Sequence, residues 1–329
     1  MYVLALDGGG TKTTAVISDE IGNVYAKLVT NRSNPTAITK QQFEHTIRSI
    51  MQELQAQNAQ VFAAVEICFA GLSGVKEKNY EAFTEEIMRE YVGDDVKVVV
   101  ENDALIALYS GTLGLEGIVQ IAGTGAITMG YDKQHELMRV GGWGYLFDDE
   151  GSGYDLGIQA LKAVFQAYDG RAAETMLTND LCQHFSVENV PQLIECIYND
   201  EHPRTNTSPL SIYVTHAAEE GDAVAKTIID EASKKFLHSI QTCYAKLSWG
   251  AKDVPVVLAG GVFSNTTLFI ERLKQLVVDQ KLPLKILPTL MEPLGGAVVG
   301  GLKSMDIVLA DDFVEVFIDN YAKFTLNNN

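Results

Sequence analysis

The sequence predicts a mixed α/β protein made of two similar halves. Each half opens with three short apolar runs separated by turns and then alternates helical segments with further apolar runs. A glycine-rich turn follows the first apolar run of each half, at residues 7–13 and 122–126. Because one architecture recurs with an offset of roughly half the chain, we expect two domains that face each other across a central cleft.

Apolar spacing predicts the elements of the first half. Three short runs separated by turn residues predict a meander of strands, and Phe43, Ile47, Ile50 and Leu54 lie near helical spacing. Further apolar runs predict two buried strands that alternate with helices. The expected strands are 2–6, 14–18, 24–30, 61–70 and 96–100, and the expected helices are 41–57, 79–91 and 104–110.

The second half repeats this order with a long helical insertion. A second meander precedes a helical region at 157–247, which a polar loop near 199–209 interrupts. A short helix of small residues is expected after Pro293. The expected strands are 118–121, 126–131, 137–140, 254–258 and 284–287, and a further helix is expected at 266–279. We expect one domain at 1–115 and the other at 116–309, with the tail at about 310–329 returning to the first domain.

Composition excludes several classes of protein. The 329 residues are 47% hydrophobic and 21% charged, which is typical of a globular chain. A net charge of −18 argues against nucleic-acid binding, because such a chain repels phosphate backbones. No apolar stretch reaches transmembrane length and no signal segment is evident, so we expect a cytoplasmic protein with no membrane partner. The four cysteines lack metal-ligand spacing and are expected to be reduced thiols.

The first glycine turn, residues 7–13, has the chemistry of a phosphate site. Glycines let backbone N–H groups approach an anion closely, and Thr11, Lys12 and Thr13 add side-chain donors. Asp7 directly precedes the glycines, where its carboxylate can hold a magnesium ion beside phosphates. A plain hairpin turn is the alternative for this turn taken alone. The second glycine turn, which contains Gly123, favours the phosphate site over a plain hairpin, because two such turns can hold one polyphosphate between them.

Two further segments can carry a site. Asp103 follows an expected strand and begins an expected helix, so it is either a helix cap or a general base that takes a proton from a hydroxyl. Residues 141–153 are rich in glycine and carboxylates, which accept hydrogen bonds from sugar hydroxyls, and Trp143 can pack on an apolar ring face. The alternative for this loop is a solvated acidic segment with Trp143 anchored in the core.

The motifs in this order resemble the BadF/BadG/BcrA/BcrD ATPase family, and within it an N-acetylglucosamine kinase-like group of the actin/hexokinase/heat-shock-70 superfamily. The motifs that carry the resemblance are 7–13, 102–104, 121–125, 141–144, 149–152 and 259–262. The resemblance implies two ribonuclease H-like (actin-like ATPase) domains that close over ATP, Mg²⁺ and a sugar.

The resemblance also implies roles for individual residues. Asp7 would be the magnesium-associated acid and Asp103 the catalytic base. The ATP-binding residues would be Gly9, Gly10, Thr11, Lys12, Thr13, Gly123, Thr124, Gly125, Gly260 and Gly261. The sugar-binding residues would be Asn34, Ser73, Asp103, Thr124, Gly142, Trp143 and Asp149.

The expected activity is phosphorylation of the 6-hydroxyl of an amino sugar, with N-acetylglucosamine as the leading substrate. A glucosamine kinase and a regulatory ATPase without a sugar substrate are the alternatives. The chain departs from mammalian-type relatives in having Tyr145 in place of a histidine and Asp148 in place of a small residue, and both lie near the expected sugar. As the partner we expect a small amino sugar, with a homodimer as one allowed assembly.

Overall fold

The computed structural model describes residues 1–199, 203–250, 252–264 and 266–326. The chain forms two compact units, one of residues 1–115 with 289–329 and one of residues 116–288. The returning segment therefore begins at residue 289, about twenty residues earlier than the sequence predicts. It does so because a helix of small residues in this segment packs directly on the sheet and a helix of the first unit.

Each unit contains a five-stranded sheet with the same topology, which confirms the predicted α/β repeat. The first sheet has the order β3-β2-β1-β4-β5 and the second β8-β7-β6-β9-β10. In each, the first three strands form an antiparallel meander and the last two run parallel to its first strand. The strands are β1 (Tyr2–Gly8), β2 (Lys12–Asp19), β3 (Val24–Asn31), β4 (Val65–Leu72), β5 (Lys97–Glu101), β6 (Gly117–Ala122), β7 (Ala126–Tyr131), β8 (Leu137–Val140), β9 (Val254–Ala259) and β10 (Leu284–Pro288).

The helices of the first unit agree with the sequence except near residue 61. There the chain forms a short helix before β4, because the side chain of Asn58 accepts a hydrogen bond from the Val61 N–H and caps it. The tail, left without an assigned element, is a helix. The helices are α1 (Lys40–Gln57), α2 (Ala59–Phe62), α3 (Glu81–Val92), α4 (Asp103–Thr112), α13 (Pro293–Ser304) and α14 (Phe313–Leu326).

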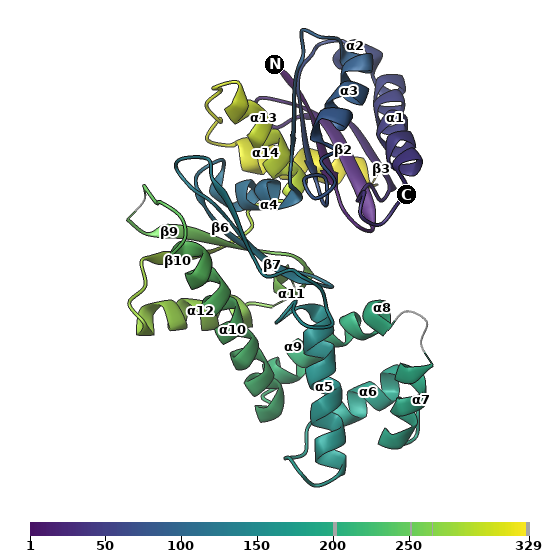
Figure 1. Ribbon diagram of the computed structural model, residues 1–329, viewed down its shortest axis with the longest axis vertical. Coiled ribbons are helices and arrows are strands. Elements are labelled where there is room, and N and C mark those ends of the chain that lie inside the picture. The colour runs from purple at the N-terminus through teal and green to yellow at the C-terminus, as the bar shows by residue number, and fades with distance from the viewer. Residues whose placement is uncertain (200–202, 251, 265, 327–329) are drawn as a thin grey trace. The chain divides into compact units, whose positions relative to one another are not determined.

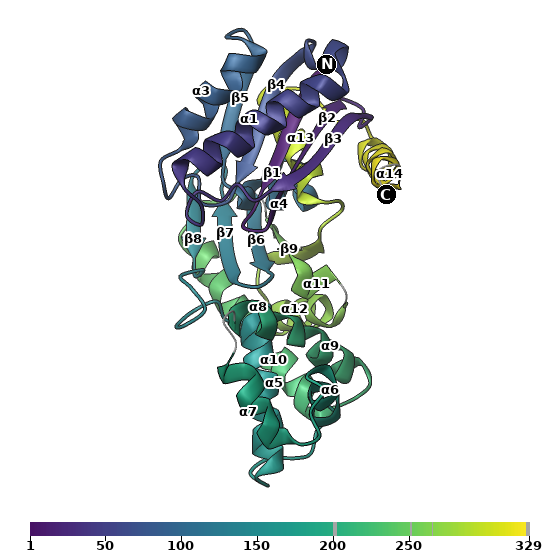
Figure 2. The same cartoon turned by 90° about the vertical axis from the view of Figure 1, so that its right-hand side faces the viewer.

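Helices cover both faces of the first sheet (Figures 1 and 2). Side chains alternate along β1, so Leu4 and Leu6 pack toward α1 and α3, while Val3 points toward α13. The glycines of α13 allow close approach: a Cβ on Gly296 would lie 1.9 Å from the Ile106 carbonyl oxygen of α4. The sheet is therefore buried on both sides, as the continuous apolar runs of its strands predict.

In the second unit, α10 and α12 cover one sheet face, and α5–α9 form a helical group (Figure 2). The expected loop near 199–209 contains two helical turns from Pro203 onward; residues 200–202 lie outside the described residues. No helix of the described residues is long and apolar enough to span a membrane. The helical elements are α5 (Gly153–Tyr168), α6 (Leu177–His184), η1 (Val190–Gln192), α7 (Leu193–Tyr198), α8 (Pro203–Thr207), η2 (Ser208–Leu210), α9 (Ser211–Glu219), α10 (Ala223–Tyr244), α11 (Gly261–Ser264) and α12 (Leu268–Asp279).

Candidate active site

The first glycine turn joins β1 to β2 as a tight hairpin. The Gly9 N–H donates to the Lys12 carbonyl at 3.0 Å, which closes the turn. Thr13 is fully buried, and its hydroxyl donates to the Ser33 hydroxyl at 2.8 Å. The side chain of Thr13 therefore fastens the turn to the chain after β3. The exposed side-chain donors of the turn are those of Thr11 and Lys12.

Gly10 is a glycine that protein packing does not require. It lies outside the left-handed region, and a Cβ built on it would meet no atom within 4 Å. Gly8, by contrast, is required by its neighbours, since its Cβ would overlap the Ser33 hydroxyl and a methyl group of Leu72. The open space above Gly10 fits a ligand that approaches the backbone closely, as a phosphate does.

Asp7 lies at the end of β1, among other carboxylates of the first unit. Burial, followed by the negative charges of Asp103 and Glu292, raises the pKa of Asp7 to about 7, although Lys12 opposes the shift. A magnesium ion would relieve this repulsion, and oxygen donors suit it. Within the described residues, no three side chains of His, Cys, Asp or Glu form a complete metal cage. An ion held at Asp7 would take further oxygen ligands from phosphates and water.

Asp103 is the first residue of α4 and is not its cap. The cap is Asn102, whose side chain accepts a hydrogen bond from the Ala104 N–H at 2.9 Å. The carboxylate of Asp103 is therefore available for another function. Burial raises its pKa to about 6, and the repulsion from Glu77 adds to this, while hydrogen bonds from the Ser73 hydroxyl and nearby backbone N–H groups oppose it.

Three predicted residues meet in one hydrogen-bonded chain in the first unit. The Asn34 amide donates to the Ser73 hydroxyl at 3.2 Å, and the Ser73 hydroxyl donates to the Asp103 carboxylate. The amide oxygen of Asn34 accepts from the N–H and hydroxyl of Thr36, which sets the orientation of the amide. The Ser73 N–H donates to the Gly8 carbonyl at 2.8 Å, so this chain is tied to β1.

The second glycine turn joins β6 to β7. The Gly123 N–H donates to the Gly125 carbonyl, and the Gly123 carbonyl accepts from the Gly153 N–H at 2.7 Å. A Cβ on Gly123 would meet no atom within 4 Å, and Thr124 is exposed. Like the first turn, this one has a glycine with open space above it, and α5 holds its backbone in place.

The two predicted adenosine-binding glycines, Gly260 and Gly261, differ in whether packing of the protein requires a glycine. Gly260 has a φ of +102°, and a Cβ on it would lie 2.4 Å from the Ala122 carbonyl oxygen. Backbone conformation and packing thus account for this glycine without any ligand. Gly261 begins α11, and a Cβ on it would meet nothing within 4 Å, so a ligand has room to approach there.

The loop after β8 presents an exposed tryptophan. Trp143 is 65% exposed, which excludes the alternative of a core anchor. The Arg139 guanidinium lies 4.3 Å from the centre of the Trp143 ring and donates to the carbonyls of Gly141 and Gly142. The Asp148 carboxylate accepts from the Trp143 N–H at 2.9 Å. The indole is therefore held by its loop while one face stays available for stacking.

Asp149 is the buried carboxylate of this loop. Its side chain is only 5% exposed, and its φ of +58° is unusual for a non-glycine residue. Burial raises its pKa, while Arg204 and the N–H groups of Gly144 and Ala126 counteract that rise by stabilising the charged form. Nη2 of Arg204 lies 3.3 Å from Oδ2 of Asp149, and its guanidinium lies 5.4 Å from the Tyr145 ring centre.

Arg204 is the residue that sequence reasoning missed. It lies 55 positions from Asp149, in a segment expected to be a polar loop, so no local pattern connects the two. Only the packing of α8 against α5 brings them together. The same packing explains why residue 125 is a glycine, because a Cβ on Gly125 would collide with the side chains of both Arg204 and Asp149.

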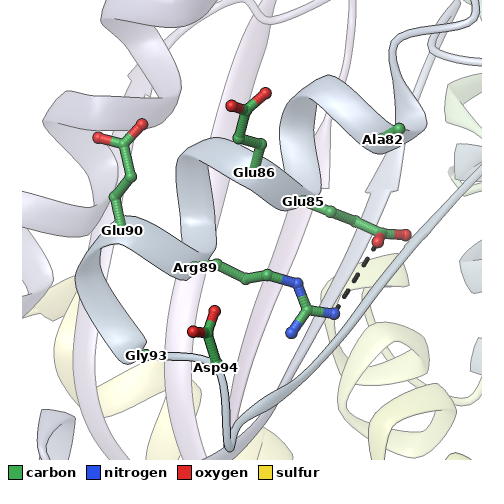
Figure 3. A pocket seen from close by; sticks show the side chains of 7 residues that line it. All are labelled: Ala82, Glu85, Glu86, Arg89, Glu90, Gly93 and Asp94. Atoms are coloured by element: carbon green, nitrogen blue, oxygen red, sulfur yellow. Dashed lines mark ion pairs between the residues drawn. The ribbon is translucent and has the colours of Figure 1, made fainter.

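A separate hollow lies on α3 and the turn after it (Figure 3). Its charged side chains include the ion pair of Arg89 with Glu85, 4.0 Å apart. None of the predicted site residues lines it. The lining residues are Ala82, Glu85, Glu86, Arg89, Glu90, Gly93 and Asp94.

Comparison with known proteins identifies the family of the chain. The model of the BadF/BadG/BcrA/BcrD ATPase family matches residues 4–300, and the chain belongs to this family. It is 31% identical to the N-acetylmuramic acid/N-acetylglucosamine kinase of Clostridium acetobutylicum over 91% of this chain and 97% of that protein. It is 29% identical to the N-acetyl-D-glucosamine kinase of Dictyostelium discoideum over 92% of this chain and 98% of that protein.

A solved structure shows the same fold. A candidate N-acetylglucosamine kinase from Porphyromonas gingivalis matches with a TM-score of 0.69 at 20% identity, covering 93% of this chain and all of that one. At this identity the match shows the architecture alone. It confirms the two-domain α/β fold that the resemblance implies.

Proposed function

We propose that this protein is an ATP-dependent kinase that phosphorylates the 6-hydroxyl of N-acetylglucosamine. The observation that carries the proposal is the hydrogen-bonded chain from Asn34 through Ser73 to Asp103. It leaves a buried carboxylate with a pKa raised toward neutrality, which is the property of a general base. The names of the two curated relatives support the choice of sugar.

In the proposed reaction Asp103 accepts the proton of the 6-hydroxyl. The hydroxyl oxygen forms a bond to the γ-phosphorus of ATP as the bond between that phosphorus and the oxygen of ADP breaks. Ser73 donates to the carboxylate and so orients Asp103. Most of the rate enhancement would come from positioning and from neutralisation of phosphate charge.

The open glycines are the proposed contacts for ATP. Backbone N–H groups at Gly10 and Gly123 would face phosphate oxygens, with Lys12 supplying positive charge, and Gly261 would lie against the adenosine. Asp7 would hold Mg²⁺, directly or through water. The ion would neutralise charge on the phosphates when bound.

The second unit supplies the proposed sugar contacts other than those of Asn34, Ser73 and Asp103. Trp143 would stack on an apolar face of the ring, because its indole is exposed and held. The buried carboxylate of Asp149 would accept hydrogen bonds from ring hydroxyls. The proposal requires both sets of groups to act on the same sugar molecule.

The test is an assay of sugar-dependent ADP release across hexoses and amino sugars, with Asp103→Asn as the variant. We expect Asp103→Asn to lower kcat by about 10²- to 10⁴-fold while ATP binding persists, since only the base is lost. Asp95→Asn is the matched control, because Asp95 is exposed on the turn before β5 and should leave turnover unchanged. Undiminished turnover of Asp103→Asn would contradict the assignment of the base.

Glucosamine and a regulatory ATPase are the competing functions. A comparison of kcat/KM for N-acetylglucosamine and glucosamine separates the two sugars, since a free ammonium group favours a carboxylate such as Asp148 or Asp149. ATP hydrolysis that proceeds at the same rate with and without every sugar would instead indicate a regulatory ATPase.

A further inference from the structure

We propose that Arg204 is a positioning residue of the sugar site, which keeps the Asp149 carboxylate oriented and charged so that it can accept hydrogen bonds from the sugar. The inference rests on the proposed function, which gives Asp149 a sugar contact and gives Arg204 no role. Its basis is the way in which the second glycine turn, α5 and α8 pack around one ion pair.

The packing of α8 against α5 fixes where the Arg204 side chain lies. The two helices are so close that a Cβ on Gly157 of α5 would lie 2.2 Å from the carbonyl oxygen of Thr207 in α8. Asp149 directly precedes α5, and its carbonyl accepts from the N–H of Ser152, the cap of that helix, at 3.1 Å. Both members of the ion pair are therefore attached to the same helix.

The second glycine turn lies against the ion pair. A Cβ on Gly125 would lie 2.6 Å from Nη2 of Arg204 and 2.7 Å from Oδ2 of Asp149. These are the two atoms that form the ion pair, 3.3 Å apart. The turn thus leaves no room for a methyl group beside the pair, and only glycine at residue 125 allows the guanidinium and the carboxylate to meet there.

The location of Asp149 is unfavourable for a charged carboxylate. Its side chain is buried, burial raises its pKa, and the negative charge of Asp148 adds to that rise. Arg204 is the strongest of the groups that oppose the rise, followed by the N–H groups of Gly144 and Ala126. Loss of the guanidinium would therefore raise the pKa of Asp149 further, because an opposite charge nearby favours the ionised form.

The neighbouring lysine serves other carboxylates. Nζ of Lys235 on α10 lies 3.4 Å from a carboxylate oxygen of Glu150 and 3.6 Å from one of Asp155. Within the described part of the chain, Arg204 is the cation that pairs with Asp149. Its charge is therefore not duplicated by a second ion pair to the same carboxylate.

The ion pair also restricts the direction in which Asp149 can accept. An ionised carboxylate has about four lone-pair positions. The N–H groups of Gly144 and Ala126 and Nη2 of Arg204 use three of them. One position remains for a sugar hydroxyl, and the donors around the carboxylate, Arg204 among them, fix where it points.

The test measures how pH affects binding of N-acetylglucosamine without ATP, by isothermal titration calorimetry. Every protein carries Asp103→Asn, because the pKa of Asp103 is about 6 and its titration would overlap; the sugar itself is neutral throughout. In this background, Arg204→Gln should raise the Kd of the sugar, and by about 3- to 10-fold more at pH 5.5 than at pH 8.5. The reason is that Asp149 then becomes protonated at a higher pH and loses an acceptor.

A double-mutant cycle identifies the group that responds. With Asp149→Asn there is no carboxylate to keep charged, so adding Arg204→Gln should cause no pH-dependent loss. Arg204→Lys keeps the charge without the planar fork, so it should weaken binding by a similar factor at every pH. Arg171→Gln is the matched control, because Arg171 is an exposed arginine of the same unit that pairs with Asp169, and it should change nothing.

A substitution that changes no charge gives an independent test. Gly125→Ala would place a methyl group against both atoms of the ion pair and so separate them. Sugar binding without ATP should therefore weaken, and more at pH 5.5 than at pH 8.5, as in Arg204→Gln. A loss of equal size at the two pH values would contradict the role of the ion pair in keeping Asp149 charged.

The outcomes separate this inference from the proposed function. If Arg204→Gln leaves the Kd unchanged, or raises it equally at both pH values, Arg204 does not keep Asp149 charged and the inference is overturned, while the kinase assignment stands. If Arg204→Gln does not fold, Arg204→Lys decides: binding equal to that of the background protein at every pH overturns the positioning role. A wild-type protein that neither binds nor phosphorylates any amino sugar overturns the proposed function itself.

Discussion

At the scale of single residues, burial raises the pKa of Asp103 and the hydroxyl of Ser73 opposes that rise. It donates to the carboxylate and thereby favours the charged form, while burial disfavours it. The two effects leave the pKa of Asp103 at about 6, so the carboxylate is mostly ionised at neutral pH. A base with this pKa is ready to accept a proton without being held permanently protonated.

Ser73→Ala should therefore change the pH dependence of the reaction. Loss of the hydrogen bond raises the pKa of Asp103 further above its ordinary value, so the carboxylate becomes protonated at a higher pH. The acid limb of kcat/KM should move upward, with activity lost strongly near pH 6 and less at pH 8.5. Profiles of kcat/KM against pH for both proteins provide the measurement. A loss of equal size at every pH would show that Ser73 only contacts the sugar.

The glycines of the first turn show how much of the site can be predicted from the types of its residues. Sequence alone indicates that residues 8–10 are glycine but not why, because a tight turn, a close packing contact and a close ligand contact select the same residue. The structure separates these reasons: Gly8 is needed for packing, while Gly10 has open space above it.

At the scale of elements, the glycines of α13 let it contact both α4 and the first sheet. Gly296 faces the Ile106 carbonyl and Gly300 faces the ring of Phe69, at distances that admit no side chain. This packing places α4, and so Asp103 at its first residue, over the sheet. The position of Asp103, which we propose as the base, thus depends on a helix nearly two hundred residues further along the chain.

Two alanine substitutions should separate packing from ligand binding. Gly296→Ala puts a methyl group 1.9 Å from a backbone oxygen and should destabilise the protein by about 3 kcal/mol. Gly10→Ala meets no protein atom, so it should fold normally yet raise the KM for ATP. Denaturant unfolding and ATP titrations measure the two effects. Equal destabilisation by both variants would contradict the ligand role of Gly10.

Apolar periodicity and turn residues predict those elements well that depend only on neighbouring residues in the sequence. The strands of both meanders follow from apolar runs, and the topology repeats as their order implies. Two features escape such reasoning. The Asn58 cap converts the expected start of β4 into α2, and the ion pair of Arg204 with Asp149 joins segments that only the tertiary fold brings together. Contacts of this second kind have no sequence period from which to infer them.

At the scale of the whole molecule, the chain leaves its first unit after residue 115 and returns at residue 289. The two ends of this excursion are adjacent, because the Leu290 N–H donates to the Ser110 carbonyl at 2.9 Å. The second unit, residues 116–288, has its own sheet and its own apolar core. We therefore expect the second unit to fold without the returning segment.

This connectivity predicts which segments of the chain can fold when they are expressed separately. A chain of residues 116–288 should fold alone and unfold cooperatively, whereas residues 1–115 alone should not, because α13 is missing from the sheet face that Val3 and Phe69 line. Joining 1–115 to 289–329 through a short glycine–serine linker should restore a cooperative unit. Thermal unfolding followed by circular dichroism compares the three chains. If 1–115 alone unfolds as cooperatively as the joined chain, the returning helices add nothing to the first unit's stability, and the dependence of Asp103 on α13 is contradicted as well.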